Sequence, residues 1–135
     1  MRSLFSFKGR IDRAQYWLAS LGLGVIATVV FGLLAAMTMA LVPPDAAGNI
    51  GLPNAANPAV AVIGLIAFLL IVLTLWASTA IGAKRCHDLG RSGWYLLLGL
   101  VPLANIWLMI EIMFVPGEPR DNKWGPAIPA RQQPE

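Results

Sequence analysis

The sequence predicts an all-α integral membrane protein with three transmembrane helices. Its longest apolar runs cover residues 16–42, 59–83 and 94–115, and the only charged residue within them is Glu111. A helix rises about 1.5 Å per residue, so about 20 apolar residues cross a hydrocarbon core about 30 Å thick. Backbone polar groups in lipid must find hydrogen bonds within their own segment, so each run is expected to be helical.

The composition agrees with a membrane location. Hydrophobic residues make up 57% of the chain and charged residues 13%, whereas a typical soluble domain is about 25% charged. We therefore expect one membrane domain over residues 1–128 and a disordered tail over residues 129–135. The formal net charge of +3 comes from basic residues that flank the runs, where they anchor to anionic headgroups, so no nucleic-acid partner is expected.

Residues 1–15 form a basic, amphipathic entry to the first run. They carry Arg2, Lys8, Arg10 and Arg13. Asp12 and Gln15 fit an N-cap and its capping-box partner, which starts the helix at about Arg13. Tyr16 and Trp17 then fall at headgroup level, where amphipathic rings are favoured. The run is far longer than the apolar region of a signal peptide, about 7 to 15 residues, so we expect it to be retained.

The first run has a small residue at every fourth position. These residues are Ser20, Gly24, Thr28, Gly32, Ala36 and Ala40. A four-residue step keeps them near one helix face, where small side chains let two backbones approach closely. The pattern predicts a packing seam, whose partner is either another span of this chain or a second copy.

The distribution of basic residues predicts an orientation. The loop over residues 43–58 is rich in Pro, Gly and Asn and contains no Lys or Arg, whereas the loop over residues 84–93 contains Lys84, Arg85 and Arg91. The positive-inside rule therefore places the N-terminus and the 84–93 loop in the cytoplasm and the 43–58 loop outside.

The third run has two readings. It crosses the membrane completely, or it breaks at Pro102 into a re-entrant hairpin with legs over residues 94–101 and 106–115. Each leg of the hairpin would be about 12 to 15 Å long, and its turn would need protein cover in lipid. The hairpin would return the C-terminal tail to the cytoplasm, and complete crossing would place the tail outside.

The 84–93 loop holds the densest group of reactive side chains, but the pattern does not predict a metal or cofactor site. Cys86 and His87 are the only Cys and His in the chain, and structural zinc takes four ligands. A Cys–His nucleophile pair is also poorly supported, because neighbours in sequence rarely meet in the required geometry. We expect Asp88 to pair with Arg85 or Arg91, or to cap backbone donors.

Two polar residues lie within the third run. Glu111 is the one acid in a predicted span, and intramembrane ionisable groups are functional candidates by default. It lies near the end of its run, so it could instead pair with a basic residue. Asn105 is a candidate for an interhelical hydrogen bond.

Three segments carry a resemblance to a known family. The first is Phe7-Lys8-Gly9-Arg10-Ile11-Asp12-Arg13-Ala14-Gln15-Tyr16-Trp17. The second comprises Arg85, His87, Asp88, Gly90, Arg91, Ser92, Gly93 and Trp94, and the third comprises Pro116-Gly117-Glu118 and Asn122-Lys123-Trp124-Gly125-Pro126. Together they resemble the domain-of-unknown-function 805 family of small bacterial inner-membrane proteins. The resemblance implies a location in the inner membrane but no reaction.

The leading functional prediction is a non-enzymatic module for interaction, assembly or envelope regulation. Its basic and aromatic cytoplasmic face would comprise Arg10, Arg13, Tyr16, Trp17, Arg85, His87, Asp88, Arg91 and Trp94, and a cytoplasmic tail would add Asn122 and Trp124. Its partners would be anionic lipid headgroups, a second copy or another membrane protein. The alternative is a subunit of an oligomeric transporter or channel that uses Glu111 and Asn105. An enzyme using His87 and Asp88 is disfavoured, because no nucleophile, metal set or phosphate loop accompanies them.

Overall fold

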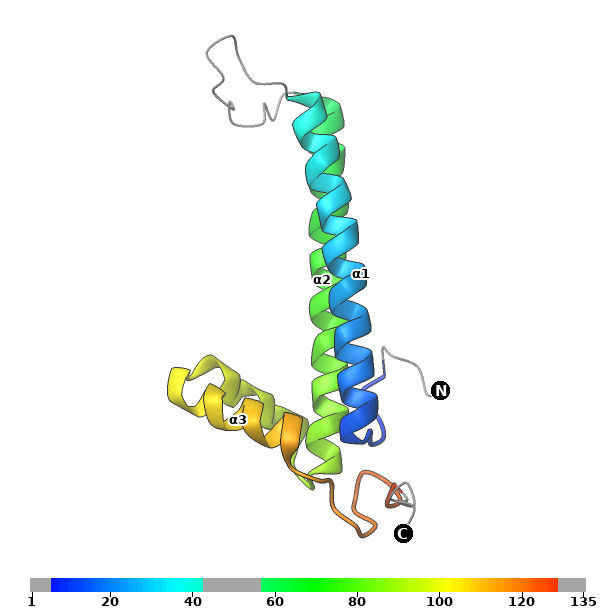
Figure 1. The fold of residues 1–135 in the computed structure, drawn as a ribbon, viewed down its shortest axis with the longest axis vertical. Coiled ribbons are helices and arrows are strands. Elements are labelled where there is room, and N and C mark those ends of the chain that lie inside the picture. The colour runs from blue at the N-terminus through cyan, green and yellow to red at the C-terminus, as the bar shows by residue number, and fades with distance from the viewer. Residues whose placement is uncertain (1–5, 43–56, 129–135) are drawn as a thin grey trace. The chain divides into compact units, whose positions relative to one another are not determined.

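The computed structural model describes residues 6–42 and 57–128 and is all-helical (Figure 1). The element order is α1 (Arg13–Leu41), α2 (Pro58–Asp88), the 3-10 helix η1 (Gly93–Leu100) and α3 (Pro102–Phe114). No strand occurs in the described residues, which confirms the all-α prediction for them. The predicted disordered tail over 129–135 and most of the predicted outer loop lie outside the described residues.

Two helices have the length and hydropathy of membrane spans. α1 has 29 residues and α2 has 31, so each is about 45 Å long. In their most apolar stretches 0% and 6% of the residues are buried, whereas the core helix of a soluble protein would be mostly covered. α3 has only 13 residues, about 20 Å, so a third transmembrane helix is not confirmed.

α1 begins where the sequence predicts. The Asp12 carboxylate accepts a hydrogen bond from the backbone N–H of Gln15 at 2.6 Å, and the Asp12 carbonyl accepts one from Tyr16 N–H at 2.9 Å. An N-cap residue satisfies the first helical donors in this way. The helix therefore starts at Arg13.

α2 extends further than predicted. It takes in residues 84–88, which the sequence analysis assigned to a loop, and it ends at Asp88. Gly90 N–H donates to His87 O at 3.1 Å, and Arg91 N–H donates to Cys86 O at 2.9 Å. This is the Schellman arrangement, with Gly90 at a φ of +72° in the left-handed region. The left-handed φ of Gly90 cannot continue a right-handed helix, so α2 ends just before it.

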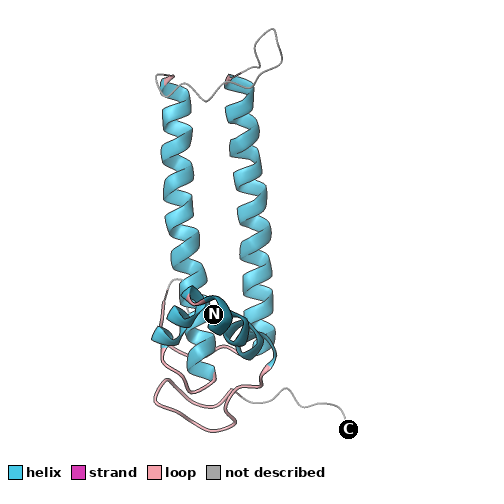
Figure 2. Ribbon diagram, turned by 90° about the vertical axis from the view of Figure 1, so that its left-hand side faces the viewer, coloured by secondary structure: helices cyan, strands magenta, loops and turns pink. Residues whose placement is uncertain are grey.

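Internal contacts divide the chain into two units. One, called here the charged unit, comprises Met1–Gly22 and Trp76–Glu135, and the other, called the apolar hairpin, comprises Leu23–Leu75. In the apolar hairpin the segments of α1 and α2 run in opposite directions, as the colours of Figure 1 show, and Figure 2 shows them alongside each other. The charged unit contains the end of α2, η1, α3 and the ion pairs described below, so the candidate site lies there.

The third apolar run folds back on itself. η1 packs against α3, and the two are joined at Val101, which has extended φ and ψ angles of −99° and 118°. A residue before proline favours this extended conformation. Pro102 then occupies the first turn of α3, where a backbone N–H would have no acceptor within the helix, so the N–H that proline lacks is not lost from the helix. The run follows a hairpin path, with its turn at Val101 rather than over residues 102–105.

The predicted seam on α1 is open within this chain. From Gly24 to Ala40 its members are exposed, and a Cβ built on Gly24 or Gly32 meets no atom within 4 Å. Packing against a second copy therefore stays a prediction.

Replacement of Gly32 by Leu should leave the folding of the isolated chain nearly unchanged, because a Cβ at this exposed position meets no atom within 4 Å. Ala35→Leu, at an exposed position outside the seam, is the matched control. Thermal unfolding of monomeric protein in detergent measures the effect, and the two variants should agree within about 1 kcal/mol. A large selective loss in Gly32→Leu would show that the seam is packed within the chain.

Candidate functional site

Asp88, the last residue of α2, pairs with two buried arginines. Its Oδ1 lies 3.0 Å from Arg10 Nη2, and its Oδ2 accepts a hydrogen bond from Arg85 Nη1. The side chains of Arg10, Arg85 and Asp88 are 2%, 0% and 3% exposed. This group of three residues is called here the arginine clasp. One carboxylate is thus shared by two guanidinium groups, which leaves one positive charge to be compensated by dipoles.

Backbone carbonyls supply that compensation. Arg85 Nε donates to Ile112 O at 2.9 Å, and its Nη2 donates to Val115 O. Both carbonyls lie at the C-terminal end of α3, where a cation is favoured by the helix dipole and satisfies unpaired acceptors. Arg85 therefore fixes the end of α3 against the end of α2.

Arg10 fixes the C-terminal tail in the same manner. Its Nη2 donates to Glu118 O at 2.6 Å and its Nη1 to Arg120 O at 2.8 Å. The backbone N–H of Glu118 in turn donates to Asp88 O at 2.8 Å. The clasp therefore joins the N-terminal segment, α2, α3 and the tail.

Two glycines allow the tail to pass this close. A Cβ on Gly117 would lie 1.9 Å from Asp88 Oδ2, and a Cβ on Gly90 would lie 2.3 Å from Glu118 Oε1. The first distance excludes any side chain at residue 117 unless the Asp88 carboxylate moves. The Pro-Gly-Glu segment of the tail is thus explained by its contact with Asp88.

A second ion pair ties α3 to the turn after α2. Glu111 Oε1 accepts from Arg91 Nε at 2.9 Å, and Glu111 Oε2 accepts from the Tyr95 hydroxyl at 2.7 Å. The Arg91 guanidinium also lies 4.5 Å from the centre of the Tyr95 ring, a cation–π distance. The hydrogen bond that Arg91 donates to Glu111 raises the pKa of Arg91, so the arginine keeps its charge. Both carboxylate oxygens of Glu111 are therefore occupied.

His87 is covered by the tail. Its ring stacks on the Trp124 indole with centroids 3.7 Å apart and planes at 8°, and its Nδ1 lies 3.3 Å from Gly9 O. The amide of Asn122 donates to His87 O at 2.9 Å and holds the tail in place. The Trp124 indole nitrogen is buried and has no hydrogen-bond partner within the described structure.

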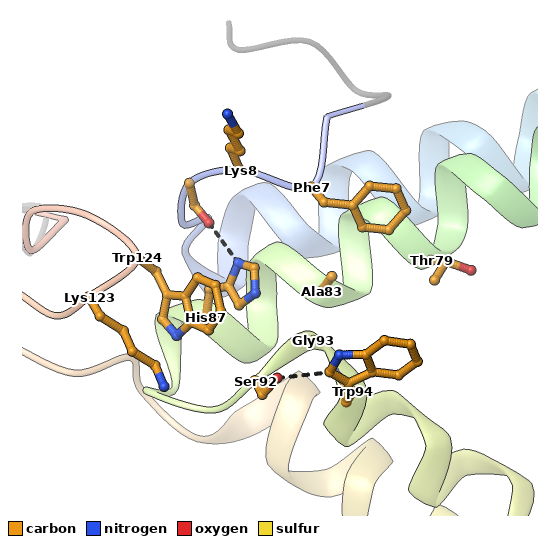
Figure 3. Close-up of a pocket in the computed structure, with 11 residues that line it drawn as sticks. Phe7, Lys8, Thr79, Ala83, His87, Ser92, Gly93, Trp94, Lys123 and Trp124 are labelled. Atoms are coloured by element: carbon orange, nitrogen blue, oxygen red, sulfur yellow. Dashed lines mark hydrogen bonds between the residues drawn. The ribbon is translucent and has the colours of Figure 1, made fainter.

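A pocket of about 660 Å³ opens beside this stack (Figure 3). The N-terminal segment contributes Phe7 and Lys8, α2 contributes Thr79, Ala83 and His87, the turn and start of η1 contribute Ser92 to Trp94, and the tail contributes Lys123 and Trp124. The Lys123 ammonium lies 5.1 Å from the Trp124 ring. Three segments that are distant in the sequence thus form one cavity with aromatic walls and cations beside it.

The predicted interaction face divides into buried and exposed residues. Arg10, Arg85 and Asp88 lie inside the charged unit and bond to each other, so they do not present their charges outward. Tyr16 packs against the buried cluster that includes Cys86. The exposed members of the face are Arg13, Trp17, Arg91 and Trp94.

Two pairing alternatives are decided by the geometry. The sequence predicted that Asp88 pairs with Arg85 or with Arg91. It pairs with Arg85, and Arg91 pairs with Glu111 instead. The partnership of Asp88 with Arg10, 78 residues away, was not anticipated, because no spacing rule connects such distant positions. Asn105 lies beside Gly99 at the contact between η1 and α3. Among residues 6–42 and 57–128, no three His, Cys, Asp or Glu side chains gather into a metal-binding group.

These features define a small helical membrane protein with two membrane-length helices and a charged unit closed by buried ion pairs. The chain belongs to the family described as protein of unknown function (DUF805), which matches residues 4–126. The family resemblance noted in the sequence is thereby confirmed.

Two Escherichia coli (strain K12) proteins are among its relatives. The inner membrane protein YhaH is 29% identical over 126 residues, which cover 93% of this chain and 89% of YhaH. The uncharacterized protein YiiR is 33% identical over 123 residues, which cover 84% of this chain and 68% of YiiR. No solved structure matches the chain. The first relative and the two apolar helices together support a location in the inner membrane.

Replacement of Asp88 by Asn should destabilise the charged unit by about 3 to 5 kcal/mol, because two buried guanidinium groups lose the carboxylate that pairs with both of them. Thermal unfolding in detergent measures the change. Asp121→Asn is the control, since Asp121 is exposed and its Oδ1 accepts only a backbone N–H in the described structure, which Asn also permits. Equal effects of the two substitutions would contradict the central role of the clasp.

A methyl group at residue 117 should also be costly. Gly117→Ala drives its Cβ into the Asp88 carboxylate and should cost about 1 to 3 kcal/mol through overpacking. Gly64→Ala, where a Cβ meets no atom within 4 Å, should be neutral or slightly stabilising in the same unfolding measurement. Tolerance of Ala at residue 117 would show that the tail does not lie against Asp88.

Proposed function

We propose that this protein is a non-enzymatic interaction module of the inner membrane whose charged unit binds anionic lipid at the cytoplasmic surface. The observation that carries the proposal is the division of charges in the charged unit. Arg10 and Arg85 are buried against Asp88 and backbone carbonyls inside it, whereas Lys8, Arg13 and Lys123 are exposed. These exposed cations are the charges that an anionic membrane attracts, and the exposed Glu118 and Asp121 of the tail oppose that attraction.

Exposed aromatic rings accompany these cations. Trp17 is 37% exposed and Trp94 is 79% exposed. Indole rings favour the headgroup region, and each Lys or Arg near an anionic surface contributes about 1 kcal/mol of attraction. Cations beside aromatic rings are the composition expected of a membrane-interface contact.

The local chemistry favours this proposal over an enzyme that uses His87 and Asp88. The carboxylate of Asp88 is shared between two arginines, and the ring of His87 lies between the Gly9 carbonyl and the Trp124 indole. Asp88 is thereby committed to ion pairs, and one ring nitrogen of His87 is engaged by the Gly9 carbonyl. Binding rather than bond rearrangement is the activity that such committed side chains support.

The occupied oxygens of Glu111 give no support to a transport path. Its ion pair with Arg91 and its hydrogen bond with Tyr95 link α3 to the turn before η1. A structural role of this kind requires no exchange of ions or protons.

Charge reversal at Arg13 should weaken the preference for anionic lipid. Native mass spectrometry of the full chain, titrated with phosphatidylglycerol or phosphatidylcholine, measures the average number of bound lipids. Arg13→Glu changes the charge by two units and should lower phosphatidylglycerol affinity by about thirtyfold, since each unit of charge contributes about 1 kcal/mol. Arg13→Lys, which keeps the charge, is the control, and higher salt should reduce the difference. Equal binding of both lipids by the unaltered chain would refute the proposal.

A further inference from the structure

The pocket beside His87 has the volume and the lining of a ligand site. Its volume of about 660 Å³ falls within the range of about 300 to 1,000 Å³ that small-molecule sites occupy. Phe7, Ala83 and Trp94 provide apolar wall, and Lys123 and Trp124 provide polar groups at the tail. A ligand that matches this lining has both an apolar chain and an anionic group.

The surroundings of the pocket change from charged to apolar along α2. Thr79, Ala83 and His87 follow one another at four-residue steps on one helix face, over about 12 Å of helix. His87 lies in the last turn of α2, beside the buried ion pairs, whereas Thr79 lies towards the apolar part of the helix. Because α2 has the length and hydropathy of a membrane span, this direction runs from the interface towards the hydrocarbon.

The N-terminal segment and the start of η1 form the two side walls of the pocket. Phe7 meets Trp76 of α2 edge to face with ring centroids 5.1 Å apart, so the segment follows α2 past Thr79. On the other side, a Cβ on Gly93 would lie 3.2 Å from Ala83 Cβ and 3.5 Å from His87 Nε2. The glycine brings the start of η1 close to α2 and places Trp94 at the wall.

Trp124, which lines the pocket at the tail, carries a donor without a partner in the described structure. The indole nitrogen of Trp124 is buried without an acceptor in the described structure, and a buried donor of this kind is rare and costly. The Lys123 ammonium lies over the same ring at 5.1 Å. An N–H donor beside a cation is the combination that a phosphate oxygen satisfies.

We propose that this pocket binds one anionic membrane phospholipid. The headgroup phosphate lies at Lys123 and Trp124, and an acyl chain extends past Ala83 and Trp94 towards Thr79. This inference rests on the proposed function, since it assigns to one lipid molecule a defined site within the charged unit. A lipid fits better than a soluble anion because the apolar wall continues towards the membrane interior.

Native mass spectrometry of the full chain with phosphatidylglycerol tests the proposal. The unaltered protein should retain one lipid more tightly than the others. Trp124→Phe keeps the stack on His87 but removes the N–H, and Thr79→Phe fills the apolar end of the pocket. Trp124→Phe should weaken the tightest site by about tenfold or more, which is the usual effect of losing one hydrogen bond to a charged group. Thr79→Phe should weaken it at least as much, because its ring occupies the space of the acyl chain.

Ser78→Phe is the matched control for the filled pocket, because Ser78 is exposed on α2 and is not among the lining residues. It should leave the tight site unchanged. Wild-type binding by both Trp124→Phe and Thr79→Phe would overturn the proposal. If those two variants bind normally while Arg13→Glu loses its lipid preference, the surface proposal stands and the pocket assignment falls. If the chain never distinguishes the two lipids, both fall.

Two other occupants would also overturn the assignment. Displacement of phosphatidylglycerol by inorganic phosphate alone, with Thr79→Phe still binding normally, would identify a simple anion site. A tight lipid that appears only after deletion of residues 129–135 would identify the chain's own tail as the occupant.

Photo-crosslinking from a benzophenone side chain at residue 94 to a lipid acyl chain should succeed if the proposal is correct.

Discussion

The charged unit depends on the sharing of one carboxylate by two buried arginines. A guanidinium group removed from water loses several kcal/mol of solvation unless it gains both an opposite charge and hydrogen bonds. Asp88 supplies the charge to Arg10 and Arg85, and the carbonyls of Ile112, Val115, Glu118 and Arg120 complete their hydrogen bonds. Those carbonyls lie at the end of α3 and in the tail. The two arginines therefore complete their hydrogen bonds only when α3 and the tail have folded against the end of α2.

The pocket is a consequence of this arrangement. Arg10 holds the N-terminal segment at the end of α2, which brings the Gly9 carbonyl to His87. The tail held by Arg10 and Asn122 places Trp124 on the other side of the ring. The cavity walls therefore come from segments that the clasp assembles, so loss of the clasp and loss of the pocket should be linked.

The third apolar run shows how a local rule and a long-range contact act together. Pro102 could be recognised in the sequence as a position where a helix breaks, and the break occurs beside it, at Val101. Whether the run then crossed the membrane or folded back could not be decided from composition, because both paths bury the same residues. The contact of η1 with α3, the Arg85 bonds at the end of α3 and the Arg91–Glu111 pair select the folded-back path.

The sequence by itself determined the two membrane-length helices, the start of α1 at Arg13 after the Asp12 cap, the break beside Pro102 and the family. Each of these depends on apolar run length or on neighbours a few residues apart. It also allowed the pairing of Arg85 with Asp88, three positions apart on one helix. Only the tertiary structure decided that Arg10 joins them, that the three side chains are buried, and that Trp124 covers His87. Contacts between residues so distant in the chain depend on how the segments pack against each other. Local patterns in the sequence, such as the spacing of apolar residues, do not specify that packing.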